Sequence, residues 1–294
     1  MSAGFDTCVL FKKTLKLLVL MGVLFLMTCS VNASMAQSFT YSGSVSYANG
    51  KYYLSKTSES LYVNNGLSMS YSKFNIYFDV SYIFQNSPWI SYTTKGGIAT
   101  GGPHHRALSQ QTGNGKRKQK EKIVLQDTIS YSQSGFGDPF ASIRYDLYSS
   151  YSGATQITII STFKAPLTDP VSGFGTGEWD FSFGSSLLRK GENCYWNASV
   201  AYWYFGDMPE LELKNALSYS LGLGYQFNRR PIMLLYSVQG MSKIVSGTEA
   251  PVSTGVGFSY RVRERITLSS TLGVGLTESL PDFSLGVGWM IGLD

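Results

Sequence analysis

The sequence predicts an all-β protein, an antiparallel transmembrane β-barrel of about twelve strands. Three observations predict it. Bulky apolar residues alternate with small or polar ones along most of the chain, tight and long connections alternate between these segments, and the faces opposite the apolar rows carry few charges. Because successive side chains of a β-strand point to opposite faces, each alternating segment is an extended strand with one apolar face.

The first 36 residues have the pattern of a secretory signal peptide. Three lysines precede an unbroken apolar run from Leu17 to Met27, and the small residues Ser34 and Ala36 provide a cleavage site before Gln37. The apolar run is too short to span a membrane comfortably as a helix. We therefore expect a cleaved signal over residues 1–36 and a mature domain over 37–294. An uncleaved anchor is the alternative.

Cysteine usage indicates export without disulfides. Cys8 and Cys29 lie in the signal, so the mature chain keeps only Cys194 and forms no intramolecular disulfide. Leu26 to Cys29 resembles a lipoprotein cleavage box, but Thr28 is a poor fit to the small residue usual there, and we do not expect lipidation.

Composition narrows the fold further. The chain has 20 Tyr, 17 Phe and 31 Gly, and no apolar run after the signal approaches the length of a membrane helix. Aromatic-rich and glycine-rich strands without a helical span suit an outer-membrane barrel, although a soluble exported domain can share this composition.

The strand pattern is clear in most segments. In 74–85, Phe74, Phe78 and Val80 lie on one face and Asn75 and Asp79 on the other. In 214–228, leucine and tyrosine alternate with serine and glycine. The segments 251–262 and 265–276 follow the same rule. In some segments, notably 231–240, the alternation is blurred. The expected strands are 38–47, 60–71, 74–85, 140–151, 154–164, 178–189, 193–204, 214–228, 231–240, 251–262, 265–276 and 282–292.

The connections between these segments alternate between tight and long. Tight hairpins are expected at 72–73, 152–153, 190–192, 228–230 and 263–264, and longer connections at 48–59, 86–139, 165–177, 205–213, 241–250 and 277–281. Outer-membrane barrels have short periplasmic turns, longer extracellular loops and an even number of strands. This pattern places both termini in the periplasm.

A soluble β-sandwich is the competing fold, because its strands also alternate faces. The polar faces here are mainly Gly, Ser and Thr, whereas a face exposed to water normally carries many charges. Small residues suit the crowded interior of a narrow barrel, and aromatic residues near strand ends suit the two membrane interfaces. Aromatic residues in such positions are Tyr71, Phe74, Tyr225, Phe227, Tyr260 and Trp289.

Residues 86–139 are the one long stretch without a clear strand pattern, and we expect an extracellular loop there, with 122–131 as a possible addition to its base. The run from Lys116 to Lys122 is basic. It suits phosphates of lipopolysaccharide, although a solvated loop is the simpler interpretation.

Three loop motifs carry a family resemblance. Gly135-Phe136-Gly137-Asp138-Pro139 precedes a strand, Phe163-Lys164-Ala165-Pro166-Leu167-Thr168 with Gly173-Phe174-Gly175-Thr176-Gly177 follows one, and Leu280-Pro281-Asp282-Phe283 opens the last. Over residues 130–294 the chain resembles the family of outer-membrane proteins named for the MetA pathway of phenol degradation. The resemblance implies an outer-membrane barrel that passes hydrophobic or aromatic small molecules. The family-motif residues are Gly135, Gly137, Asp138, Pro139, Pro166, Pro281 and Asp282.

Two positions depart from the expected patterns. Thr168 is followed by Asp169, where the family usually has a glycine soon after the threonine. The last strand, with Trp289 and Ile291, resembles the signal read by the barrel-assembly machinery, but the chain ends in Asp294 instead of an aromatic residue.

An enzyme is not expected. His104 and His105 are the only histidines and lie in the Gly/Pro-rich loop, so no strand holds an imidazole beside a serine for nucleophilic catalysis. No cysteine or carboxylate cluster lies near them in the sequence, and a solvated pair is favoured over a metal site. We expect no cofactor, no metal and no nucleic-acid partner; an outer-membrane lipid hydrolase is the least favoured alternative.

Strand parity places six charged side chains on the inner face, where they either pair or line an aqueous path. These pore-lining candidates are Asp79, Arg144, Asp146, Lys164, Asp180 and Arg261. The sequence thus predicts a Gram-negative outer-membrane, porin-like protein for passive passage of a small molecule, hydrophobic and aromatic ones included. Its expected partners are outer-membrane lipids, lipopolysaccharide, the barrel-assembly machinery and an unidentified solute. A structural or surface-interaction protein without transport is the alternative.

Overall fold

The computed structural model describes residues 37–51, 57–86, 133–168, 174–206, 213–227, 231–245 and 248–293. The predicted signal and most of the predicted loop 86–139 lie outside these ranges, and Ser38–Asp294 form one compact unit. The strands are β1 (Gln37–Gly50), β2 (Ser58–Tyr71), β3 (Phe74–Gln85), β4 (Gln133–Phe136), β5 (Phe140–Ser149), β6 (Thr155–Lys164), β7 (Asp180–Lys190), β8 (Cys194–Tyr204), β9 (Ala216–Gln226), β10 (Ile232–Met241), β11 (Val252–Arg263), β12 (Ile266–Gly275) and β13 (Phe283–Gly292).

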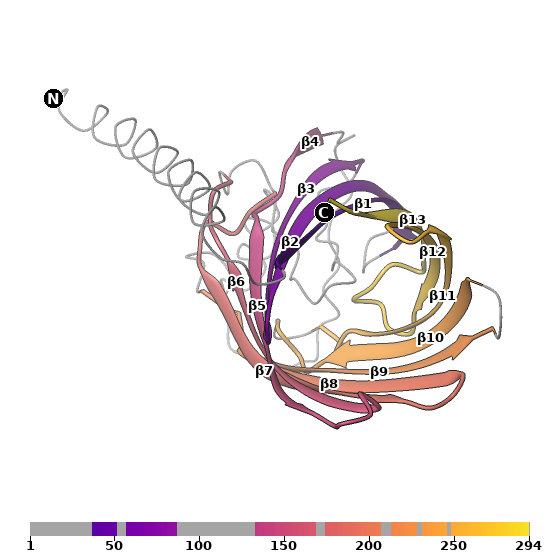
Figure 1. Ribbon diagram of the computed structural model, residues 1–294. Helices are drawn as coiled ribbons and strands as arrows, with labels where there is room; N and C mark the ends of the chain where they lie inside the picture. Colours follow the sequence, from indigo (N-terminus) through magenta and orange to yellow (C-terminus); the bar gives the residue numbers. More distant parts are fainter. Residues whose placement is uncertain are drawn as a thin grey trace, which may run out of the picture. The chain divides into compact units, whose positions relative to one another are not determined.

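The strands form one closed antiparallel ring (Figure 1). Each strand bonds to its neighbours along the chain, except that β4 and β5 both bond to β3 and not to each other, and β13 pairs with β1 to complete the ring. β4 and β5 are two parts of one wall strand, because both pair with β3 and the register changes by one residue between Tyr82↔Phe136 and Asp79↔Phe140. The ring therefore has twelve members, which confirms the predicted barrel and excludes the two-sheet sandwich.

The alternation of tight and long connections is also present. Tight connections occupy 72–73, 150–154, 191–193, 227–231 and 264–265, and longer ones 51–57, 86–132, 165–179, 205–215, 242–251 and 276–282. We call the two rims the short-turn end and the long-loop end. β1 starts and β13 finishes at the short-turn end. β4 lies within the range predicted as loop 86–139 and extends the wall beyond β5 at the long-loop end.

The bulky apolar rows lie on the outer face of the ring. Leu221 and Leu223 on β9 are each 60% exposed, whereas Gly222 and Gly224 beside them are buried. Exposed bulky rows over a buried small face are the reverse of a soluble core and fit a wall that faces hydrocarbon. Among the described residues, no helix is long and apolar enough to cross a membrane.

Aromatic side chains gather near both ends of this outer face. At the short-turn end, the rings of Phe74 and Tyr145 are 4.8 Å apart, and those of Tyr225 and Phe227 are 5.1 Å apart. At the long-loop end, the rings of Tyr82 and Phe136 are 4.9 Å apart. Amphipathic rings settle at membrane interfaces, so the two groups fit the two edges of an apolar band.

The seam between β1 and β13, which closes the ring, depends on a glycine. Gly43 lies opposite Trp289, and a Cβ atom added at Gly43 would overlap the indole ring. The indole covers the strand where glycine has no side chain, an arrangement that fixes cross-strand register. Gly240 and Tyr219 repeat it between β10 and β9.

We predict that Gly43→Ala lowers the free energy of unfolding by about 1–3 kcal/mol, because the new methyl group displaces the indole. Urea unfolding in lipid vesicles measures the loss. The double variant G43A/W289A is expected to lose less stability than the sum of the two single variants, because both substitutions act on the same contact.

Gly257→Ala is the matched control for this seam. A Cβ atom at Gly257 meets its nearest neighbour, the Leu235 Cβ, at an ordinary 3.5 Å. Equal losses for the two glycine variants would contradict the role assigned to Trp289.

Candidate functional site

The inner face of the barrel is mostly small, polar and uncharged. On β1, β2 and β3, Asn64 donates a hydrogen bond to Ser44 at 3.0 Å and accepts one from Ser81 at 2.6 Å. Ser199 and Ser220 hydrogen-bond across β8 and β9 at 2.7 Å. These hydroxyl and amide groups give the interior a hydrophilic wall without the cost of unpaired buried charges.

Inward-facing side chains are accessible to solvent from the short-turn end to the middle of the strands. Arg144 and Arg261 are exposed, and strand parity turns both side chains inward. Met290 is 49% exposed on the inner face of β13, and Leu235 is 38% exposed between Gly224 and Gly257. Thr271, in the middle of β12, is exposed as well. The inner wall is therefore wetted over at least its short-turn half.

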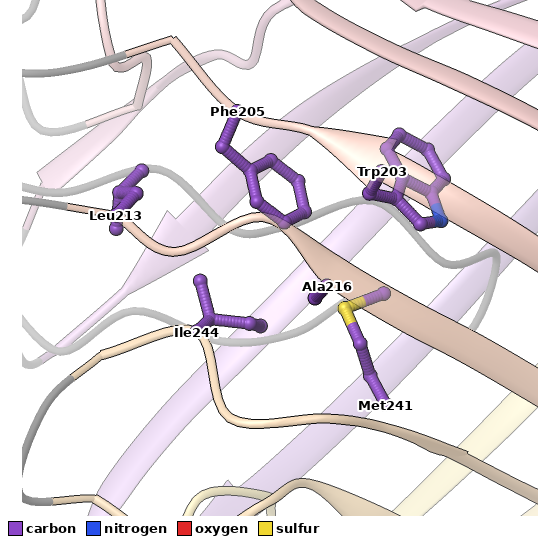
Figure 2. Packing of buried hydrophobic residues seen from close by; sticks show 6 residues of the cluster. All are labelled: Trp203, Phe205, Leu213, Ala216, Met241 and Ile244. Carbon is purple, nitrogen blue, oxygen red and sulfur yellow. The ribbon is translucent and has the colours of Figure 1, made fainter.

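The long-loop end has an apolar inner lining (Figure 2). Trp203 and Phe205 extend the inner row of β8 and stack with their ring centroids 5.8 Å apart. Leu213, Ala216, Met241 and Ile244 complete this buried cluster, which we call the mouth cluster. The backbone N–H of Lys214 donates to the carbonyl of Ile244 at 2.7 Å, so the cluster joins two long connections.

A second apolar group lies on the inner face of β1, β2 and β3. Ala48, Tyr62 and Ile83 are buried there with Phe174, which belongs to the connection between β6 and β7. The Phe174 ring lies so close to Gly135 that a Cβ atom there would come within 2.7 Å of it. Phe174 therefore packs on the inner face of β4, in the space that a side chain at Gly135 would fill.

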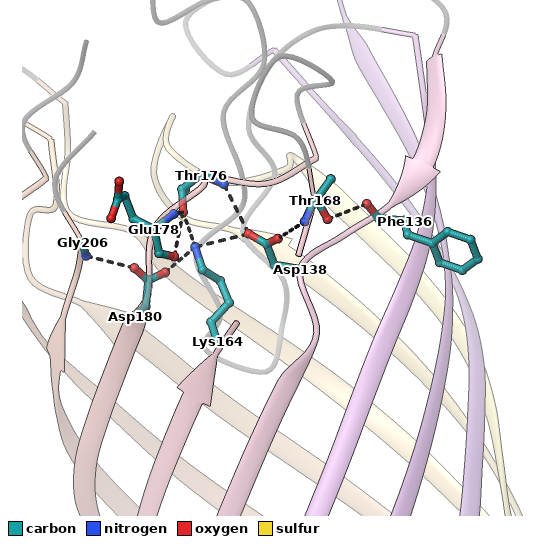
Figure 3. A network of polar contacts seen from close by, with 8 residues as sticks. All are labelled: Phe136, Asp138, Lys164, Thr168, Thr176, Glu178, Asp180 and Gly206. Carbon is teal, nitrogen blue, oxygen red and sulfur yellow. Dashed lines mark hydrogen bonds and ion pairs between the residues drawn. The ribbon is translucent and has the colours of Figure 1, made fainter. Parts of the chain in front are cut away.

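A buried ionic network holds this connection in place (Figure 3). The Lys164 ammonium lies 2.6 Å from an Asp180 oxygen and 3.6 Å from an Asp138 oxygen, and it also donates to the Thr176 hydroxyl. Asp138 accepts hydrogen bonds from the backbone N–H of Thr168 at 3.0 Å and of Thr176 at 3.3 Å. Asp180 accepts one from the backbone N–H of Gly206 at 3.1 Å. We call this group the Lys164 network.

The Lys164 network is desolvated and places two carboxyl groups around one ammonium group. The Lys164 side chain is 0% exposed, and the side chains of both aspartates are almost as deeply buried. Burial raises the pKa of the Asp138 carboxyl, and the Lys164 charge opposes this effect. Buried ion pairs seldom add much net stability, so we assign the network a positioning role for three chain segments, 137–139, 165–179 and 205–206.

The structure separates the six predicted pore-lining residues into two groups. Lys164 and Asp180 lie in the buried network at the long-loop end, where they are shielded from solvent. Asp79 is also buried and accepts a hydrogen bond from the Tyr77 hydroxyl at 3.1 Å. Arg144, Asp146 and Arg261 lie toward the short-turn end, where both arginines are exposed.

Asp146 pairs with a neutral partner. Its carboxylate accepts a hydrogen bond from the Thr158 hydroxyl at 2.9 Å, and a bulge follows it in the pairing of β5 with β6. Within the described chain, no hydrogen bond or ion pair joins Asp146 to Arg144. The two residues, which the sequence places on one face, thus do not brace each other there.

The first two family motifs meet in space. Asp138 of the first motif binds Thr168 and Thr176 of the second, and the Ala165 N–H donates to the Pro139 carbonyl at 3.0 Å. A Cβ atom at Gly175 would crowd the Asp138 carboxylate. Gly137 donates to the Ser81 carbonyl at 2.8 Å, and Pro166 is half-buried beside Ala165.

The third motif lies at the rims of β1, β12 and β13. The Pro281 carbonyl accepts from the Gly275 N–H at 3.0 Å, and a Cβ atom at Gly50 would lie 2.8 Å from Pro281 and from the backbone of Asp282. Leu280 is buried and Asp282 is exposed. The motif therefore positions a long connection, and within the part of the chain that the structure describes it contributes no charged group to the Lys164 network.

Sequence reasoning missed the aromatic lining of the long-loop end. The signal was present on β8, where the inner row passes through Ser199 and Ala201, changes to Trp203 just before the strand ends and continues to Phe205 just after it. Bulky residues on a strand face that otherwise carries small side chains mark the position where side chains fill the barrel interior. Phe174 gives no such signal, because it lies in a connection.

The described chain holds no group of three or more His, Cys, Asp and Glu side chains placed to bind a metal. His104 and His105, the basic run 116–122, and Asp169 and Gly173 all lie outside the described residues.

The fold has known counterparts, although no protein-family model and no curated protein matches the chain. The NanC porin structure is 9% identical, with a TM-score of 0.51 over 85% of this chain and 98% of that one. The KdgM porin has 6% identity and a TM-score of 0.48 over 87% and 99% of the two chains. The Pseudomonas putida toluene transporter TodX has 10% identity and a TM-score of 0.42 over 90% of each.

The likeness to NanC concerns the fold alone, and the other two scores are too low to carry an argument. The chain thus has the barrel fold of the outer-membrane porins. The resemblance to the MetA-pathway family stays a prediction.

We predict that Lys164→Met costs about 3–5 kcal/mol of unfolding free energy, because it leaves two buried carboxylates without their cation. The connection 165–179 is expected to become sensitive to protease in folded protein. Urea unfolding and limited proteolysis measure the two effects.

The triple variant D138N/K164M/D180N removes all three charges together and is expected to recover most of the lost stability. Lys214→Met removes an exposed lysine at the same end and serves as the control. A Lys164→Met protein as stable as the Lys214→Met protein would contradict the positioning role.

Proposed function

We propose that the protein is an outer-membrane barrel through which small molecules pass passively. The observation that carries this proposal is the asymmetry of the inner wall, which is mostly polar and accessible to solvent from the short-turn end to mid-strand and is lined with buried apolar groups at the other end. A purely structural barrel of this width has no need for an inner face of hydroxyl groups and glycines that solvent can reach. The short turns face the periplasm, as in other barrels of this class.

The long-loop end controls entry in this proposal. The Lys164 network fixes the connection 165–179 so that Phe174 packs against β2 and β3, and the mouth cluster narrows the interior at β8, β9 and β10. Apolar side chains at an entrance favour solutes that have an apolar part. This agrees with the hydrophobic or aromatic solutes that the sequence resemblance implies, and the wetted half then carries the solute onward.

The first test of passage is solute flux into liposomes that contain the purified protein. We expect swelling with small solutes and discrete conductance steps in planar bilayers. A correctly folded barrel, shown by a heat-dependent shift in gel mobility, that supports neither flux nor conductance would favour the structural or surface-interaction alternative.

A second prediction concerns the entrance. Phe174→Ala removes the ring that packs against Gly135, so solute entry and single-channel conductance are expected to rise. Phe183→Ala is the matched control, because Phe183 is 63% exposed on the outer wall of β7. An unchanged conductance in the Phe174→Ala protein would remove this connection from the entrance.

A further inference from the structure

We infer that the barrel selects for anions and that Arg144 and Arg261 form the selecting site at its short-turn end. The inference rests on the proposed passage and adds the sign of the charge that the barrel favours. It follows from the depth, the spacing around the ring and the exposure of these two side chains.

Both arginines lie in the short-turn half of the inner wall, Arg261 close to the rim and Arg144 deeper. Arg261 pairs with Thr267, the second residue of β12, and its backbone N–H donates to the carbonyl of Pro231 in a neighbouring tight connection, at 2.8 Å. Arg144 pairs with Asn75, the second residue of β3, and with Ile160 in the middle of β6. The two guanidinium groups therefore start from the inner wall at different heights of the short-turn half.

The two arginines lie on opposite walls. Five strands separate β5 from β11 in either direction around the ring, and Figure 1 shows the two strands on opposite sides of the barrel. A solute that leaves through this end must pass between them. Arginine is always charged and presents several donors in one plane, so it binds carboxylate, phosphate and sulfate groups well.

Neither guanidinium is neutralised by the described chain. Arg144 and Arg261 are exposed, and no hydrogen bond or ion pair joins them to another described side chain. Asp146 lies near Arg144 along β5, but it is only half-exposed and accepts a hydrogen bond from Thr158. Lys190, at the short-turn end of β7, adds a third exposed positive charge that parity turns inward.

The acidic side chains of the inner wall cannot cancel this field. Asp79 is buried in the middle of β3, and Asp138 and Asp180 are buried at the long-loop end, where they face the Lys164 ammonium. At 0.1 M salt, charges separated by more than about 10 Å are largely screened, so the exposed groups nearest the path decide its selectivity. Those groups are mainly positive at the short-turn end.

The test is the reversal potential of the reconstituted full-length mature protein in a planar bilayer, under a gradient of potassium chloride. We expect wild-type protein to favour chloride over potassium. The double variant R144Q/R261Q is expected to lower that permeability ratio by about twofold to fivefold. Asp146→Asn is expected to shift it in the opposite direction, because it removes a half-exposed carboxylate from the inner wall near Arg144.

Arg189→Gln is the matched control. Arg189 is exposed at the same end of the barrel but lies on the outer wall, where it pairs with Trp196 and Thr155. The Arg189→Gln substitution changes the net charge of the protein but not its inner wall, so the reversal potential should stay at the wild-type value. The selectivity of the wild-type protein should also weaken as salt rises from 0.01 to 1 M, because the Debye length falls from about 30 to 3 Å.

Two failures are distinguishable. A folded barrel without conductance overturns the passage proposal and, with it, the selecting site. A conducting barrel that favours potassium, or in which R144Q/R261Q and Arg189→Gln give the same ratio as wild type, overturns the anion site alone.

Discussion

The structure depends on the rule that a backbone surrounded by hydrocarbon must satisfy all its own hydrogen bonds. An open sheet would present two unpaired edges to lipid, at several kcal/mol for each unsatisfied group. The pairing of β13 with β1 removes both edges, over a register that runs from Thr40↔Gly292 to Asn49↔Phe283. Closure also decides what each side chain meets, because in a ring the two faces of every strand become an outside and an inside. The bulky rows and the glycine-rich rows are consequences of that single constraint.

Closure leaves the two ends of the barrel free to differ, and they do. Tight turns at one end contribute few atoms, so solvent enters there and wets side chains as deep as Thr271. Longer connections at the other end have enough chain to fold inward, and they bring Phe174 and Leu213 to the inner face. A connection that folds into a narrow barrel needs an anchor, because without one its movement from the interior into water would cost little free energy. The Lys164 network supplies that anchor from three segments far apart in the sequence.

The sequence predicts the wall better than the site. The period of two places every strand except β4 within a few residues, because the pattern is local and each strand meets the same two environments. Parity also assigns Lys164 and Arg144 to the same inner face. It cannot say that one is sealed and the other wetted, because burial at Lys164 depends on Asp138, Asp180 and Thr176, which only the closed fold brings together. The shift of register that divides β4 from β5 is likewise invisible, since Gly137 to Pro139 looks like the end of a loop.

The inner wall differs between its two ends because its charged side chains are buried at the long-loop end and exposed to solvent at the short-turn end. A charge in a dry site interacts strongly with its immediate partners, and Lys164 is held by two carboxylates and a hydroxyl within its own network. A charge in a wetted site keeps its hydration and acts on whatever solute approaches. The inward-facing charges thus have two different roles: those at the long-loop end hold the chain in place, and those at the short-turn end would act on a solute in the proposed passage. If the arginines were buried and Lys164 were exposed, the connection 165–179 would have no anchor, and the short-turn end would have no exposed arginine to select solutes by charge.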